Sequence, residues 1–153
     1  MMQDLLISFY GDDFTGSTDV MESLTFAGLR TVLFLDPPTD EQVAALGEVR
    51  SIGVAGRTRS MIPDLAEAEL RPVFEAFRKL KTPMVHYKTC STFDSSAEIG
   101  SIGRAIDVGS EIFNPVYVPL VVGAPLLRRY CAFGNLFASS ADACKFIKER
   151  LIR

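Results

Sequence analysis

Two adjacent carboxylates stand in the first polar loop of the sequence. Asp12 and Asp13 directly follow an apolar run at residues 5–10 and lie in the segment Gly-Asp-Asp-Phe-Thr-Gly-Ser-Thr-Asp, which begins at Gly11. Carboxylates at such a position can accept hydrogen bonds from substrate hydroxyls, take up a proton or hold a metal ion. Adjacent acids are unfavourable without a ligand, because like charges repel when both are partly desolvated. The alternative is structural: Asp12, Asp13 or Thr15 caps the helix that follows.

Two arginines form the second polar loop. Arg57 and Arg59 follow the apolar run at residues 51–55, within the segment Gly-Arg-Thr-Arg-Ser, and Ser60 adds a hydroxyl beside them. Guanidinium groups pair bidentately with carboxylate or phosphate, so this loop is typical of a site where a planar acid group must be oriented. The alternative is that both arginines are exposed surface residues.

A lysine, an aspartate and several hydroxyls make up the third polar loop. It reads Lys-Thr-Cys-Ser-Thr-Phe-Asp-Ser-Ser from Lys88, and Ser91, Asp94 and Ser95 are its further candidates for ligand contact. A lysine at the end of an apolar strand is expected to point its ammonium toward an anion, although it could instead pair with one of the two adjacent aspartates. Helix capping is the structural alternative for Asp94 and Ser95.

Short apolar runs rich in β-branched and aromatic residues predict the strands that position these loops. They alternate with helix-period segments, which is the pattern of βαβ units around a parallel sheet. The predicted fold is therefore α/β, a Rossmann-like three-layer αβα arrangement with a mainly parallel sheet. The predicted strands cover residues 5–10, 30–35, 51–55, 84–88 and 116–122. Ligands bind outside the carboxyl ends of the strands in such sheets, so we expect the three polar loops to converge at one end.

Helices are predicted between these strands from three- and four-residue apolar spacing. The first long helix carries its apolar stripe at Leu70, Val73, Phe74, Phe77 and Leu80. The second carries its stripe at Ile99, Ile102, Ile106, Ile112 and Phe113. The first is expected to begin near Pro63, and Ser95 or Ser96 is available to cap the second. Shorter helices are predicted over residues 18–26, where Gly28 would end the helix, and over 39–46 and 143–153.

Composition excludes several classes of function. Sixteen Lys plus Arg against nineteen Asp plus Glu give the 153-residue chain a net charge of −3. There is no long basic tract, so nucleic acid is not expected as a partner. The apolar runs are far shorter than the roughly 20 residues of a membrane-spanning helix and the N-terminus lacks the basic region of a signal peptide, so we expect a cytoplasmic protein without a membrane partner.

Cysteine and histidine usage predicts no metal site. Three cysteines without a Cys-x-x-Cys pair suit a reducing compartment and argue against a zinc knuckle. His86 is the only histidine, and its place inside a predicted strand favours a structural role over catalysis. No Gly-rich P-loop or dinucleotide fingerprint occurs in the sequence.

The three loops together resemble the four-carbon acid sugar kinase family. The similarity is carried by Gly-Asp-Asp-Phe-Thr-Gly-Ser-Thr-Asp, by Gly-Arg-Thr-Arg-Ser and by Tyr-Lys-Thr-Cys-Ser-Thr-Phe-Asp-Ser-Ser. It extends over about residues 5–138, and it includes Ser-Ile-Gly-Arg-Ala-Ile-Asp and the later segment 130–137. Only the N-terminal half of that family is matched.

The resemblance implies ATP-dependent phosphorylation of the 4-hydroxyl of four-carbon sugar acids such as threonate, erythronate and their oxo derivatives. Under it, the two adjacent aspartates would contact substrate hydroxyls, and Arg57 or Arg59 would bind the carboxylate of the small-molecule sugar acid. The third loop would supply the remaining contacts. The candidates for substrate binding are Asp12, Asp13, Thr15, Arg57, Arg59, Ser60, Lys88, Ser91, Asp94 and Ser95.

The resemblance also predicts how the chain is organised. Residues 1–138 are expected to form the sugar-acid-binding domain, and residues 139–153 a divergent tail. ATP and Mg²⁺ belong to a nucleotide-binding domain that we expect to be absent from this chain, so neither is expected to bind the chain alone. A separate nucleotide-binding half would then be a partner. No residue is assigned as the general base.

Two other functions are weighed against this interpretation. Asp13-Phe14-Thr15 matches the second half of the Asp-x-Asp-x-Thr motif of haloacid-dehalogenase-type phosphatases. Gly11 occupies the position of their nucleophile, so the covalent step would fail. The second alternative is a non-catalytic module that senses a sugar acid or mediates an interaction.

Overall fold

A parallel four-stranded sheet forms the centre of the molecule. The computed structural model describes residues 5–140 and 143–149. The strand order is β2-β3-β1-β4, with β1 (Ile7–Gly11) between β3 (Ser51–Ala55) and β4 (Met84–Lys88), and β2 (Thr31–Phe34) at the edge. All three pairings are parallel. The predicted α/β class with a mainly parallel sheet is confirmed, together with four of the five predicted strands.

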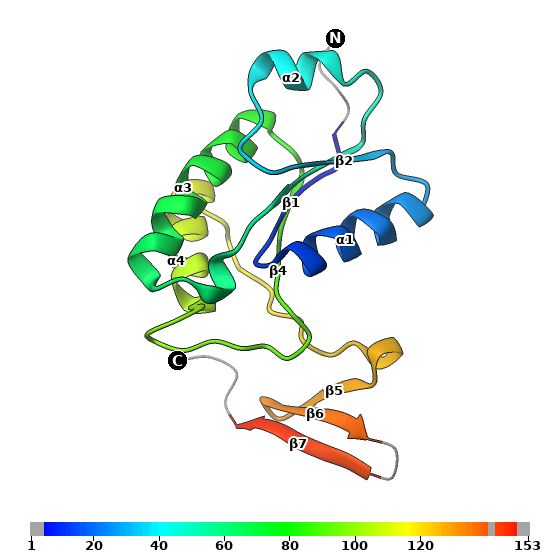
Figure 1. Cartoon of the computed structure of the whole chain (residues 1–153), viewed down its shortest axis with the longest axis vertical. Coiled ribbons are helices and arrows are strands. Elements are labelled where there is room, and N and C mark those ends of the chain that lie inside the picture. The colour runs from blue at the N-terminus through cyan, green and yellow to red at the C-terminus, as the bar shows by residue number, and fades with distance from the viewer. Residues whose placement is uncertain (1–4, 141–142, 150–153) are drawn as a thin grey trace.

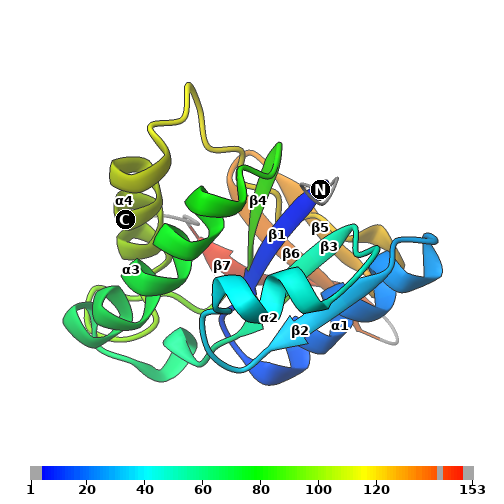
Figure 2. The ribbon, with the colours of Figure 1, turned by 90° about the horizontal axis from the view of Figure 1, so that it is seen from above.

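Helices cover both faces of this sheet. Figures 1 and 2 show α1 (Phe14–Phe26) on one side and both α3 (Pro63–Leu80) and α4 (Ile102–Phe113) on the other. The short helix α2 (Asp40–Ala45) lies between β2 and β3 in the chain and has a capping box at Thr39. The connection from β1 to β2, which contains α1, and the connection from β3 to β4, which contains α3, therefore lie on opposite faces of the sheet.

The helix boundaries follow local capping. Helix α1 begins four residues before the predicted start, because Asp13 caps it by accepting from the backbone N–H of Gly16. Pro63 is the first residue of α3, as predicted. Helix α4 begins after Ser101, which is the N-cap residue and whose hydroxyl accepts from the backbone N–H of Arg104. Of the two serines predicted to cap this helix, Ser95 does accept from a free N–H at its start, that of Ile102, although it is not the N-cap residue.

The core lies between the sheet and the α3–α4 pair. The predicted stripe of α3 is buried there, except for the partly buried Leu80. The ring of Tyr10 on β1 stacks on that of Tyr87 on β4, with centroids 5.6 Å apart. The buried members of this cluster are Tyr10, Val54, Leu70, Val73, Phe74, Phe77, Ala105, Val108 and Ile112.

A second, antiparallel sheet follows the long connection after α4. It consists of β5 (Arg129–Ala132), β6 (Asn135–Ser140) and β7 (Ala143–Glu149), in that order, preceded by the 3-10 turn η2 (Pro125–Leu127). The predicted helix over 143–153 is wrong where the structure describes it, because the backbone of β7 pairs with β6 and this pairing overrides the amphipathic pattern. Residues 150–153 of that prediction lie outside the described residues.

The predicted strand at 116–122 is also wrong. This stretch forms no strand and runs along the surface, with Val116 99% and Val121 80% exposed. Pro115 and Pro119 lack the backbone N–H that a central strand must donate, so the apolar composition misled the prediction. In the part of the chain that the structure describes, no helix is both long enough and apolar enough to cross a membrane.

Candidate sugar-acid site

The three polar loops meet at the carboxyl end of the parallel sheet, as predicted. The backbone N–H of Asp12, after β1, donates to the carbonyl oxygen of Lys88, at the end of β4, over 3.0 Å. The backbone N–H of Arg59, after β3, donates to the carbonyl oxygen of Asp12 over 3.1 Å. The loops after β1 and β3 lead to helices on opposite faces, and such a point in an α/β sheet leaves a crevice where ligands bind.

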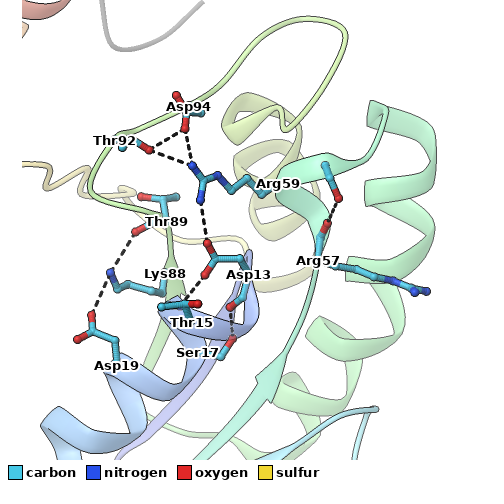
Figure 3. A network of polar contacts seen from close by, with 12 residues as sticks. Asp13, Thr15, Ser17, Asp19, Arg57, Arg59, Lys88, Thr89, Thr92 and Asp94 are labelled. Atoms are coloured by element: carbon cyan, nitrogen blue, oxygen red, sulfur yellow. Dashed lines mark hydrogen bonds and ion pairs between the residues drawn. The ribbon is translucent and has the colours of Figure 1, made fainter.

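Arg59 is the centre of the polar network at this edge. Its guanidinium donates from Nη1 to Asp13 over 2.9 Å and from Nη2 to Asp94 over 2.6 Å, and Nη2 also reaches the hydroxyl of Thr92 at 3.1 Å (Figure 3). Its side chain is one-third exposed, at 33%. Hydrogen bonds to Asp94 and then to Asp13 raise the pKa of Arg59, so the group stays a cation. One arginine thus joins all three loops.

Asp13 caps helix α1, which is the structural alternative that the sequence offered, and it also pairs with Arg59. One carboxylate oxygen caps α1 at the backbone N–H of Gly16, and the other accepts from Arg59. Its carbonyl oxygen also accepts from the hydroxyl of Ser17 over 2.6 Å. The capping bond fixes Asp13, and Asp13 in turn orients the guanidinium.

Asp12 is buried beneath this network. Its side chain is 3% exposed, and its Oδ1 is buried without a hydrogen-bond partner among the described residues. Burial and the neighbouring charge of Asp13 raise the pKa of Asp12 to about 6, while Arg59, the backbone N–H of Cys90 and Lys88 act in the opposite direction. Asp12 therefore holds its proton to a higher pH in the folded chain than a free aspartate does.

Lys88 pairs with a residue that was not among the predicted site residues. Its ammonium lies 3.3 Å from the carboxylate of Asp19, on α1, and donates to the carbonyl oxygen of Thr89 over 3.2 Å. The predicted alternative of a pair with Asp12 or Asp13 is not what the structure shows. The lysine side chain is 20% exposed, so its charge is partly accessible to solvent.

Arg57 points away from the network. Figure 3 shows its side chain extending away from Asp13, Arg59 and Asp94. Its Nε donates to Glu69 over 3.1 Å, and its side chain is 71% exposed. The hydroxyl of Ser60 donates to the carbonyl oxygen of Arg57 over 3.1 Å, which stabilises the turn η1 (Thr58–Ser60). Of the two arginines left open as carboxylate ligands, the geometry therefore favours Arg59.

The other predicted residues occupy supporting places. Thr15 is exposed in the first turn of α1, and Ser91 is half-buried in the turn after β4. The hydroxyl of Ser95 accepts from the backbone N–H of Ile102 over 3.1 Å, so it ties the third loop to the start of α4. None of these bonds involves the guanidinium of Arg59.

The described residues do not offer a ready metal site. No group of three or more His, Cys, Asp or Glu side chains within them is arranged to hold a metal ion. Asp13 and Asp94 already share Arg59 between them. Burial lowers the pKa of His86, which keeps this imidazole neutral within β4 and fits its predicted structural role.

A model of a known family matches almost the entire chain. It is described as the sugar-binding N-terminal domain, and it matches residues 7–150. The chain belongs to this family. The resemblance inferred from the three loops is thereby confirmed.

Curated relatives of this sugar-binding domain are longer proteins. The present chain is 51% identical over 135 residues to a protein of Paraburkholderia graminis named 3-oxo-isoapionate kinase. The match covers 88% of this chain and 29% of that protein. The chain is 34% identical over 136 residues to a 3-oxo-tetronate kinase of Methylobacterium radiotolerans, with 89% and 31% covered. The chain thus spans about three-tenths of the length of these relatives.

Solved structures share the fold of the sugar-binding domain. A Salmonella typhimurium LT2 protein superposes with a TM-score of 0.78 at 28% identity, covering 95% of this chain and 32% of that chain. A Haemophilus influenzae protein gives a TM-score of 0.77 at 26% identity, covering 90% and 32%.

Sequence reasoning missed two members of the network. Thr92 bonds both Arg59 and Asp94, and Asp19 holds the ammonium of Lys88. Both lie inside the motifs that carried the family resemblance, so their presence there was the available signal. The sequence does not give the directions of the Thr92 and Asp19 side chains, because these depend on how α1 and the loop after β4 pack.

The structure also bears on the phosphatase alternative. A Cβ at Gly11 would lie 2.8 Å from the backbone of Ser17, closer than real Cβ contacts allow. A nucleophilic aspartate could not replace Gly11 without moving the start of α1. The tight packing at Gly11 thus agrees with rejecting a covalent phosphatase mechanism.

Proposed function

We propose that this chain is the sugar-acid-binding part of an ATP-dependent kinase that phosphorylates four-carbon acid sugars or closely related oxo acids. The observation that carries the proposal is the position of Arg59, which joins the three polar loops at the carboxyl end of the sheet in a domain of the sugar-binding family. The names of the longer relatives, 3-oxo-isoapionate kinase and 3-oxo-tetronate kinase, support the kinase class.

The network suits a molecule that carries both a carboxylate and hydroxyls. Arg59 offers a planar set of donors to the carboxylate, and Lys88 adds a second cation nearby. Asp13, Asp94 and Thr92 take at most three of the five N–H donors of Arg59, so they can hold the guanidinium in place while it also donates to the ligand's carboxylate. Asp13, held by its capping bond, can accept from ligand hydroxyls while it still orients Arg59.

The proposed reaction transfers the terminal phosphoryl group of ATP to the 4-hydroxyl of the bound acid. We assign only the acceptor side to this chain. Arg59 would fix the carboxylate end, so the far hydroxyl of a four-carbon acid extends toward the open side of the crevice. ATP and its Mg²⁺ would be bound by the part of the longer relatives that this chain does not match, or by a separate chain.

A ligand panel tests the proposal directly. Thermal unfolding of the 153-residue chain is measured with threonate, erythronate and 3-oxo-tetronate, and then with erythritol, which lacks the carboxylate, and succinate, which lacks the hydroxyls. A ligand specific for the folded state stabilises it by about 2.7 kcal/mol at a hundredfold excess over its Kd. We expect stabilisation by the sugar acids at millimolar concentration, and little by the two controls. Equal shifts with erythritol, or none with any acid, would reject the proposal.

A further inference from the structure

Phe93 stands between two residues of the Arg59 network. Its neighbours in the chain, Thr92 and Asp94, both accept from the guanidinium. Phe93 itself is 1% exposed, and its φ of 57° lies in the left-handed region that residues with a Cβ rarely adopt. A buried aromatic ring and an unfavourable backbone conformation thus occur together in the middle of the candidate site.

The ring of Phe93 links this loop to the second sheet. It forms a buried cluster with Ile102, at the start of α4, and Leu136, on β6. Ile106 and Val122 pack against this cluster from the side. Leu136 is fully buried, so this contact anchors the antiparallel sheet to the loop after β4.

The backbone conformation of Phe93 connects the packing of its ring to the positions of the Thr92 and Asp94 side chains. Its N–H donates to the carbonyl oxygen of Cys90 over 2.9 Å, which closes a turn immediately before Asp94. The left-handed conformation aims the side chains on either side of Phe93 toward Arg59 while the ring points into the cluster. If the ring lost its packing, the backbone would relax toward a commoner conformation and carry Thr92 and Asp94 away from the guanidinium.

We propose that Phe93 is a positioning residue for the sugar-acid site, and that the β5–β7 sheet, through Leu136, controls the affinity of the site by holding Phe93 in place. This inference rests on the proposed function for its ligand, but the positioning itself is a property of the chain alone. It gives the second sheet a role beyond stability, because a shift of β6 would move two of the partners of Arg59.

A matched pair of variants tests the positioning role. Leu136→Ala and Leu70→Ala each remove the same atoms from a fully buried leucine, but Leu70 lies on α3 in the main core without contact to this cluster. We expect Leu136→Ala to weaken threonate binding by about tenfold and Leu70→Ala to leave it unchanged while lowering stability. Equal effects of both variants on affinity would overturn the inference.

A double-mutant cycle separates positioning from general softening of the domain. In a Thr92→Val, Asp94→Asn background the two partners of Arg59 that flank Phe93 are already altered, so Leu136→Ala should cost no further affinity. An undiminished loss in that background would show that Leu136 acts by another route. If Leu136→Ala does not fold, the milder Leu136→Met and Leu70→Met pair is compared in the same way.

A readout without ligand distinguishes failure of this inference from failure of the proposed function. The NMR signal of the Arg59 Nε–H reports the surroundings of the guanidinium directly. We expect it to shift in Leu136→Ala and in Phe93→Leu, and to stay in place in Leu70→Ala. If the wild-type chain binds no sugar acid yet this pattern is found, the proposed function fails and the positioning role stands. An Arg59 Nε–H signal that does not move in Leu136→Ala would refute the positioning role even if the wild-type chain binds the sugar acid.

Discussion

The backbone N–H of Arg59 donates to the carbonyl oxygen of Asp12 over 3.1 Å, although the two residues belong to different loops. This bond holds the backbone of Arg59, in η1, next to the loop after β1, where its guanidinium binds Asp13. The position of the side chain is therefore set by the backbone of the sheet edge before any ligand is present. Preorganisation of this kind lowers the cost of binding.

Gly100 packs closely against the backbone of Arg59. It has a φ of +64°, and a Cβ placed on it would lie 2.5 Å from the carbonyl oxygen of Arg59. Gly47 has a similar φ of +67° but open space around it, which makes it a matched control. We expect Gly47→Ala to lower the free energy of unfolding by about 1 kcal/mol, and Gly100→Ala to lower it by about 1 to 3 kcal/mol more because of the clash.

Chemical denaturation of the two glycine variants measures this difference. Gly100→Ala should also weaken sugar-acid binding, because the backbone of Arg59 must move to make room. Equal losses of stability in both variants would mean that the contact between Gly100 and Arg59 is not held in solution.

Asp12 makes stability depend on pH. Its pKa is raised to about 6 in the folded chain, so the folded state holds the proton more tightly than the unfolded state does. The free energy of unfolding should therefore fall as the pH rises from about 4 to about 6. Asp12→Asn removes this charge, and at pH 8 it should raise the free energy of unfolding by about 2 to 3 kcal/mol.

The control for Asp12 is Asp107→Asn, which changes an exposed aspartate on α4. Urea unfolding of both variants at pH 4 and pH 8 supplies the comparison. The gain of Asp12→Asn should be large at pH 8 and nearly absent at pH 4, whereas Asp107→Asn should show neither. A gain of equal size at both pH values would contradict the burial of a charged Asp12.

The fold could be predicted well where an element is determined by residues close together in the sequence. The stripe of α3, the proline at its start and the alternation of strands and helices all follow from spacing and propensity. The failures at 116–122 and 143–153 have one cause: an apolar or amphipathic pattern does not say which backbone partner is present. Pro119 removes a donor in the first case, and β6 provides a pairing edge in the second.

The site could be predicted to the level of its loops. Parallel strands end at a common edge, so the three polar segments had to meet there. The choice between Arg57 and Arg59 could not be made from sequence, because it depends on Glu69, twelve residues away on α3, which binds Arg57. Asp19 was missed for the same reason, since its pairing with Lys88 is created by the packing of α1 against the sheet.

Phosphoryl transfer should require more than this chain. The sequence contains no Gly-rich P-loop to bind the phosphates of ATP, and the relatives named as kinases are about three times as long. We expect the purified chain, incubated with ATP, Mg²⁺ and threonate, to form no phosphorylated acid by mass spectrometry. Formation of that product by the chain alone would place a nucleotide site within its loops and contradict the assignment of only the acceptor side.

Isothermal titration of threonate or 3-oxo-tetronate into the wild-type chain, Arg59→Ala and Arg57→Ala tests the central proposal most directly. Both variants remove one guanidinium, but only Arg59 lies between Asp13 and Asp94. We predict that Arg59→Ala weakens binding by roughly 2 to 5 kcal/mol, while Arg57→Ala stays within about 0.5 kcal/mol of the wild type. Loss of binding in Arg57→Ala with full affinity in Arg59→Ala would contradict the proposed site, and no binding to the wild-type chain at millimolar acid would contradict the proposed function.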